Sequence, residues 1–118
     1  MKQEELLILI PKIEKYIEYI LNMLLKIPRV EKFNIGNEYK SSIYNLLKNA
    51  IYINKIGNRM EYLNTIDAEL VLERIFLRIM YNNRWIDEKK FKVSMEQISE
   101  IGKIVGGLIK YYAKDNKK

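Results

Sequence analysis

A row of basic and aromatic residues between positions 40 and 59 combines helical spacing with side chains that can pair with anions or stack on flat rings. Its members are Lys40, Tyr44, Lys48, Tyr52, Lys55 and Arg59. Steps of three and four residues place side chains on one side of a helix. Cations in such a row pair with successive phosphates, and tyrosine rings stack on unpaired bases. The row therefore predicts contact with RNA. An ordinary solvated helix face, or tyrosines buried in a subunit interface, are the alternatives.

Two carboxylates, Glu69 and Glu73, lie one helical turn apart and raise the question of catalysis. The chain has no His and no Cys. Without His, a four-helix di-metal site would lack its Glu-x-x-His ligands, and without Cys there is no thiolate ligand or disulfide. No nucleophile has an adjacent base. We therefore expect no enzyme activity, no metal site and no cofactor.

Four further residues are candidates for contact with another subunit or a partner protein. Tyr19 and Met23, four positions apart, form a second apolar strip beside the main one of their helix. Arg74 and Arg78 lie in a helix that is apolar nearly all round, so this helix is expected to be central or to pack against another subunit. The two arginines either contact RNA or a partner, or pair with carboxylates of their own helix.

The elements that must position these residues are long helices. The 118 residues include only 5 Gly and 2 Pro, and 48% are hydrophobic against 31% charged, which is typical of one globular domain with few turns. Apolar residues recur at helical spacing, and Pro11 fits the first turn of the first helix. The expected fold is all-α, with residues 1–118 forming a single antiparallel up-down-up-down four-helix bundle. The helices are expected at about 11–26, 35–56, 59–82 and 88–113, with residues 1–10 left open.

The corner between the first two helices is encoded by Pro28, which stops the first, and by Asn34, a good N-cap for the second. Gly36 allows a close approach of another segment. Arg29 and Lys32 either extend the basic surface or complement the carboxyl end of the first helix.

The last helix carries two local signals. Asp87 is its expected N-cap. Gly102 and Gly106, four positions apart, each cost about 1 kcal/mol against Ala in a helix and so imply a close neighbour.

The charge balance favours a polyanionic partner. There are 21 Lys and Arg against 15 Asp and Glu, a formal charge of +6, which suits RNA, DNA or an anionic membrane surface. No basic helix with one exposed apolar face is apparent, and no apolar run reaches the roughly 18 residues of a membrane span, so membrane binding is not expected. The N-terminus lacks the basic start of a signal peptide, and we expect a cytoplasmic protein.

Two stretches resemble a known family. Ile27-Pro-Arg-Val-Glu-Lys-Phe-Asn-Ile-Gly-Asn37 resembles the "(L/F)PR..(R/K)FTLG(D/E)" corner of small four-helix-bundle proteins related to the accessory variability determinant (Avd) of diversity-generating retroelements. Proteins encoded in 23S rRNA intervening sequences belong to the same superfamily. Glu100-Ile-Gly-Lys-Ile-Val-Gly-Gly-Leu-Ile109 resembles the family's "EIGR(M/L)LGGWI" signature. The chain differs from the family pattern at Asn34, Asn37 and Leu108.

The resemblance implies a ring-shaped homo-oligomer, typically a pentamer, with a basic surface. It implies a non-catalytic accessory subunit that binds a reverse transcriptase and its template RNA, or an RNA/DNA hybrid. The alternative is a protein-only helical module, as in the intervening-sequence proteins, that oligomerises while its charge serves solubility.

Overall fold

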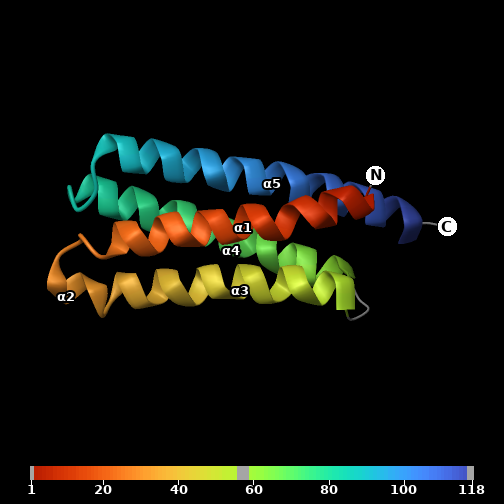
Figure 1. Cartoon of the computed structure of the whole chain (residues 1–118), viewed down its shortest axis with the longest axis horizontal. Coiled ribbons are helices and arrows are strands. Elements are labelled where there is room, and N and C mark those ends of the chain that lie inside the picture. Colours follow the sequence, from red (N-terminus) through yellow and green to blue (C-terminus); the bar gives the residue numbers. More distant parts are fainter. Residues whose placement is uncertain (1, 56–58, 117–118) are drawn as a thin grey trace.

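The computed structural model describes residues 2–55 and 59–116, with side chains for 5–55 and 59–114, and these ranges form helices without any strand. The helices are α1 (Lys2–Leu24), α2 (Arg29–Lys32), α3 (Ile35–Lys55), α4 (Arg59–Asn82) and α5 (Glu88–Asn116). Figure 1 shows the four long helices side by side with alternating direction, and the short α2 at the end where α1 turns back into α3. The predicted all-α antiparallel bundle is confirmed. The expected end of the second helix at Ile56 lies outside the described residues.

Each long helix packs against two others, so the bundle is a closed four-membered arrangement. α1 contacts α3 and α5, and α4 contacts the same two helices from the opposite side. The molecule measures 50 × 23 × 21 Å along its principal axes. Its core runs the whole length of the rod, because every long helix presents one apolar stripe inward. Fully buried members include Leu9, Ile13, Ile20, Ile43, Leu46, Leu63, Ile66, Ile98 and Leu108.

α1 begins at Lys2, so residues 2–10, which the sequence left open, are helical and Pro11 is not in the first turn of the helix. Pro11 lies inside α1 and has no N–H to donate to the carbonyl of Leu7. Both residues are on the exposed side of α1, where water can solvate that carbonyl. Leu6 and Leu9 are buried on the opposite side. Core contacts of the first two turns thus outweigh the missing hydrogen bond.

The corner after α1 contains a short helix that the sequence pattern did not predict. Pro28 is the N-cap residue of α2, and its carbonyl accepts the backbone N–H of Glu31 at 2.9 Å. Asn34 does not cap α3 as expected: its side-chain amide donates to the carbonyl of Val30 at 3.3 Å, at the end of α2. Gly36 does permit a close approach, since a Cβ there would lie 3.2 Å from the carbonyl oxygen of Glu31.

The two glycines of α5 differ in their surroundings. A Cβ on Gly102 would meet the Arg74 guanidinium at 3.6 Å and Leu70 Cδ1 at 3.9 Å, which is ordinary contact with α4. A Cβ on Gly106 would meet no described atom within 4 Å. The close neighbour expected from sequence is therefore present for Gly102 and missing for Gly106 within one chain.

The α4–α5 connection is built from two local hydrogen-bond motifs. Trp85 N–H donates to the carbonyl of Met80 at 2.9 Å, and Arg84 N–H donates to that of Tyr81 at 3.0 Å. These two bonds make a Schellman motif, which closes the carboxyl end of α4. Asp87 Oδ1 then accepts the backbone N–H of Lys90 at 2.8 Å, as expected of the N-cap of α5. Within the described ranges, none of the helices combines the length and the apolar character that crossing a bilayer requires.

Candidate nucleic-acid interface

Five of the six residues in the predicted basic row lie along one outer face of α3, which we call the α3 stripe. The inner face of α3 is fixed in the core by Tyr39, Ile43, Leu46, Ala50 and Ile53, so the residues between them must point outward. The α3 stripe comprises Lys40, Tyr44, Lys48, Tyr52 and Lys55.

The three lysines of the α3 stripe form no ion pair with any carboxylate among the described residues. Lys48 and Lys55 are exposed, and Lys40 is partly exposed. The ion pairs that the described residues do form lie on α1 and α5, where they join Lys12 to Glu100, Lys90 to Asp87 and Lys92 to Glu88. These three lysines are therefore not neutralised by an ion pair within the described residues, and their charge can attract an external anion.

The two tyrosines of the α3 stripe differ in how much ring surface they offer. Tyr44 is 42% exposed, and Tyr52 is 37% exposed. The Tyr52 ring packs against Tyr62 of α4, with centroids 5.4 Å apart and planes tilted by 56°. Such a pair fixes the Tyr52 ring and occupies part of it. Tyr44 is the more accessible platform for an unpaired base.

Arg59, the sixth member of the predicted row, is not on α3. It is the first residue of α4, and its guanidinium carbon lies 5.4 Å from the ring centroid of Tyr112 on α5. This cation–π contact directs the side chain across the bundle end. Arg29 and Lys32 lie on α2, which contacts α3 at the end where α1 turns back (Figure 1); Arg29 is exposed and Lys32 is partly exposed.

The four residues predicted to contact another subunit or a partner also differ in how exposed they are. Met23 is 2% exposed, and Ser94 Oγ lies 3.7 Å from its sulfur, so Met23 belongs to the core and not to an interface. Tyr19 is partly buried against the core, Arg74 is partly exposed and Arg78 is exposed. Neither arginine forms an ion pair with a carboxylate in the described part of the chain.

An apolar surface accompanies Arg78 on α4. We call it the α4 apolar row: Val71, Leu72, Ile75 and Ile79. These side chains are between 39% and 50% exposed. In the sequence, this row was visible only as a helix that is apolar nearly all round. The structure shows that the apolar residues of α4 that do not enter the core face outward.

Glu69 and Glu73 belong to a polar network that links three helices inside the bundle. Glu73, on α4, has no exposed surface. Its Oε1 accepts the hydroxyl of Tyr16 on α1 at 2.7 Å, and the Tyr16 oxygen lies 2.7 Å from that of Tyr39 on α3. Its Oε2 lies 2.5 Å from Ser42 Oγ, and Ser42 Oγ lies 2.7 Å from Glu69 Oε1. Both carboxyl groups are therefore engaged in hydrogen bonds with side chains of neighbouring helices.

Burial and the hydrogen-bond geometry together place a proton on Glu73. Burial raises the pKa of Glu73 from 4.5 to about 8, against the opposing hydrogen bonds from Ser42 and Tyr16. One hydroxyl hydrogen on Ser42 cannot serve both carboxyl groups. A proton on Glu73 Oε2 resolves this, because Glu73 then donates to Ser42 Oγ and Ser42 donates to Glu69. Burial likewise raises the pKa values of Tyr16 and Tyr39 well above 10.0, so both remain donors.

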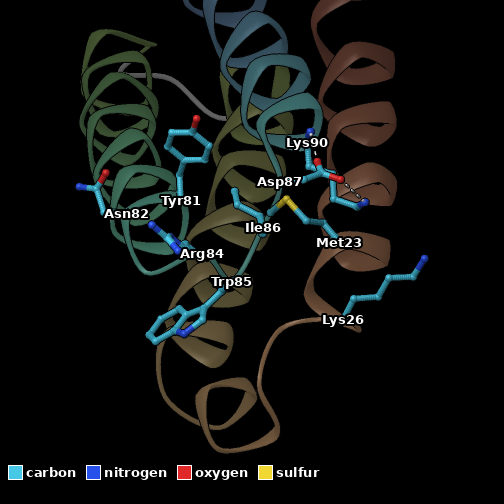
Figure 2. Close-up of a pocket in the computed structure, with 9 residues that line it drawn as sticks. All are labelled: Met23, Lys26, Tyr81, Asn82, Arg84, Trp85, Ile86, Asp87 and Lys90. Atoms are coloured by element: carbon cyan, nitrogen blue, oxygen red, sulfur yellow. Dashed lines mark hydrogen bonds and ion pairs between the residues drawn. The ribbon is translucent and has the colours of Figure 1, made fainter.

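A basic hollow at one end of the bundle was not predicted from sequence. It has a volume of about 650 Å³ and lies where α1 ends and α4 turns into α5. Figure 2 shows side chains from both segments around it, among them Lys26, Arg84, Trp85 and Lys90. The available signal was the single Trp of the chain beside an arginine in a short connection. The end of α1 is far from this connection in the sequence and lies beside it only in the folded chain.

Comparison with known proteins gives one family match that spans nearly the whole bundle. A family model described as bAvd-like matches residues 7–112. The match includes both stretches, 27–37 and 100–109, on which the resemblance was based, and the predicted family is thereby confirmed. No curated protein matches the chain significantly.

Proposed function

Because the chain belongs to the bAvd-like family, we propose that it is a non-catalytic accessory subunit that binds RNA along the α3 stripe and a reverse transcriptase through another surface. We propose that it acts in the cytoplasm and needs no cofactor. The single observation that carries the RNA-binding proposal is the row of three unpaired lysines on α3.

The dimensions of the α3 stripe suit a phosphate backbone. With a rise of about 1.5 Å per residue, Lys40 and Lys48 are roughly 12 Å apart along α3, and Lys48 and Lys55 roughly 10 Å. Neighbouring phosphates of a strand are much closer than this, so each lysine can reach a different phosphate. We propose that Arg29 and Lys32, on the adjoining α2, lengthen this basic surface at one end. Tyr44 supplies an exposed ring beside the cations.

We further propose that the subunit assembles with copies of itself into a ring, as the family resemblance implies, with five subunits as the expected number. The α4 apolar row supports this proposal, because four large apolar side chains together on one helix are unusual for a surface that always faces water.

Gel shifts with a structured RNA test the RNA-binding proposal. The test variant is Lys48→Glu with Lys55→Glu, both exposed and unpaired on α3. The matched control is Lys103→Glu with Lys110→Glu, which reverses two exposed charges on α5. We expect RNA affinity to fall by about ten-fold or more in the α3 variant and much less in the control, because local phosphate contacts are lost only in the former. Equal losses in both variants, or no binding by the unchanged protein at low salt, would contradict the proposal.

A protein-only interaction module is the second candidate, and the α4 apolar row is the observation that favours it. In that case the chain would oligomerise and hold its partner through apolar contacts alone. Co-purification with the reverse transcriptase after nuclease treatment separates the two candidates. A complex that survives nuclease and is insensitive to the α3 reversals supports the protein-only module.

A further inference from the structure

The hollow at the α1 and α4–α5 end of the bundle, which we call the end hollow, has the size of a small-ligand site. Its volume of about 650 Å³ falls within the range of roughly 300–1,000 Å³ that such sites occupy. Lys26 lines it just beyond the end of α1, and in Figure 2 its side chain extends outward, while Arg84 and Trp85 come from the α4–α5 connection on the other side. Met23 and Ile86 lie between them, so the interior is apolar and the rim is charged.

Positive charge dominates the end hollow and its surroundings. Lys26, Arg84 and Lys90 line it, and a smaller adjoining depression shares Lys26 and Lys90 and adds Lys89. Asp87 is the only acidic residue among those that line either hollow. Its carboxylate is already engaged, because it accepts the backbone N–H of Lys90 at 2.8 Å and lies 3.4 Å from the ammonium group of the same residue. Lys26 and Arg84 form no ion pair with any described residue.

Arg84 occupies a backbone position that favours glycine. Its φ is 63°, the left-handed region, at the point of the Schellman motif where helices most often have Gly. A side chain in this conformation strains the backbone, and such strain recurs at functional sites. The strained residue here places an unpaired guanidinium at the rim of the hollow. The rigid motif also fixes the position of the next residue, Trp85.

Trp85 adds an aromatic surface to the cations. It is partly exposed and packs in part against the core. An indole is a strong stacking surface for a nucleobase, and a guanidinium fork matches the oxygens of a phosphate. An acidic peptide would satisfy the cations but would gain nothing from the indole. A ligand with both a flat ring and a phosphate uses every feature of the site.

We propose that the end hollow binds a nucleoside 5′-phosphate, either free or at the end of a strand, with the base against Trp85 and the phosphate held by Arg84, while Lys26 and Lys90 add positive charge around the site. This site lies on residues outside the α3 stripe, so it stands or falls independently of the function proposed above.

The fluorescence of Trp85 tests the proposal directly, because the chain contains 1 Trp. The probes are adenosine 5′-monophosphate, a 5′-phosphorylated adenosine trinucleotide, adenosine, inorganic phosphate and a hexaglutamate peptide. We expect saturable quenching by the two phosphorylated nucleotides, with adenosine and phosphate binding about ten-fold more weakly or worse. Tighter binding of the trinucleotide than of the mononucleotide identifies a strand end, and equal binding identifies a free nucleotide.

Arg84→Gly is the informative variant, because it removes the guanidinium and relieves the strained backbone at once. We expect nucleotide affinity to fall about ten-fold while the melting temperature rises by about 4 °C. A more stable protein that binds less cannot owe its defect to unfolding. The control is Lys110→Gln, which removes one exposed charge far along α5 and should leave binding unchanged.

Three results would overturn the proposal. The first is no quenching by either nucleotide, the second is equal binding of hexaglutamate or of phosphate alone, and the third is unchanged affinity in Arg84→Gly. Gel shifts with the Lys48 and Lys55 reversals report on the α3 stripe separately, so failure of one site is distinguishable from failure of the other.

Discussion

Glu73 is a carboxyl group that the bundle keeps protonated in its interior. Hydroxyl groups from α1 and α3 surround it, and the nearest carboxylate, Glu69, is reached only through Ser42. Burial disfavours its charged form and raises its pKa to about 8. The unfolded chain, with a pKa near 4.5, releases this proton earlier as the pH rises.

The contribution of Glu73 to the stability of the bundle should therefore decline with rising pH. Above the unfolded pKa of 4.5 the folded state holds a proton that the unfolded state has lost, so this contribution to the free energy of unfolding falls until about pH 8 and then levels off. The total change from Glu73 is on the order of a few kcal/mol. Glu73→Gln keeps the shape and the neutral hydrogen bonds but does not titrate, so it should be markedly more stable than the unchanged protein at about pH 9 and similar at about pH 5.

Urea denaturation of both proteins at the two pH values measures this difference. The remaining titratable groups are common to both chains, so they cancel in the comparison. Parallel stability–pH curves would show that Glu73 is ionised in the folded protein.

The burial of Glu73 shows what residue patterns leave out. Tyr16 and Tyr39 were predictable as buried members of apolar stripes. Glu73 reads as a polar residue of its helix, and only the placement of Tyr16 and Ser42 from two other helices gives it partners. An acidic side chain is tolerated in the core when side chains from other helices form hydrogen bonds with it. The residues that neighbour Glu73 in the sequence do not reveal these contacts.

At the scale of the helices, substitutions of Gly106 and Gly36 report on how closely neighbouring segments approach each glycine. Gly106→Ala should raise the free energy of unfolding by up to about 1 kcal/mol, because Ala favours the helix and its Cβ enters open space. Gly36→Ala should show no such gain, because its Cβ would lie 3.2 Å from a carbonyl oxygen of Glu31 that already accepts Asn34 N–H. Thermal unfolding of the two variants compares the sites directly. Equal stabilisation by both would refute the close approach at the corner.

The helices themselves were predictable wherever apolar spacing and core packing agree, as in α3 and α4. The misses occur where a local rule competes with packing. Pro11 should begin a helix, yet Leu6 and Leu9 extend α1 past it into the core. Asn34 was expected to cap α3, yet its side-chain amide donates to a carbonyl of α2, a helix that was not predicted. The α3 stripe could be predicted from residue spacing alone. The end hollow could not, because its lining residues come both from α1 and from the distant α4–α5 connection.

At the scale of the whole molecule, the α4 apolar row should decide the oligomeric state. We expect the unchanged protein to sediment as a homo-oligomer, with a pentamer as the proposed form. Ile75→Asp, in the middle of this row, should shift it to smaller species, because an unpaired carboxylate in an apolar interface is strongly unfavourable. Ser99→Asp, at an exposed position of α5, is the control and should not. A monomer in the unchanged protein, or insensitivity to Ile75→Asp, would count against assembly through α4.

The central claim is that unneutralised lysines on one face of α3 contact RNA phosphates. Each phosphate contact contributes roughly −0.7 to −0.9 to the slope of log affinity against log salt concentration. The most direct test is this slope, measured by fluorescence anisotropy with labelled RNA, for the unchanged protein and for a variant with Lys40, Lys48 and Lys55 all replaced by Gln. We expect a slope shallower by roughly 2 in the variant. Identical slopes would contradict it, because the phosphates would then be contacted elsewhere.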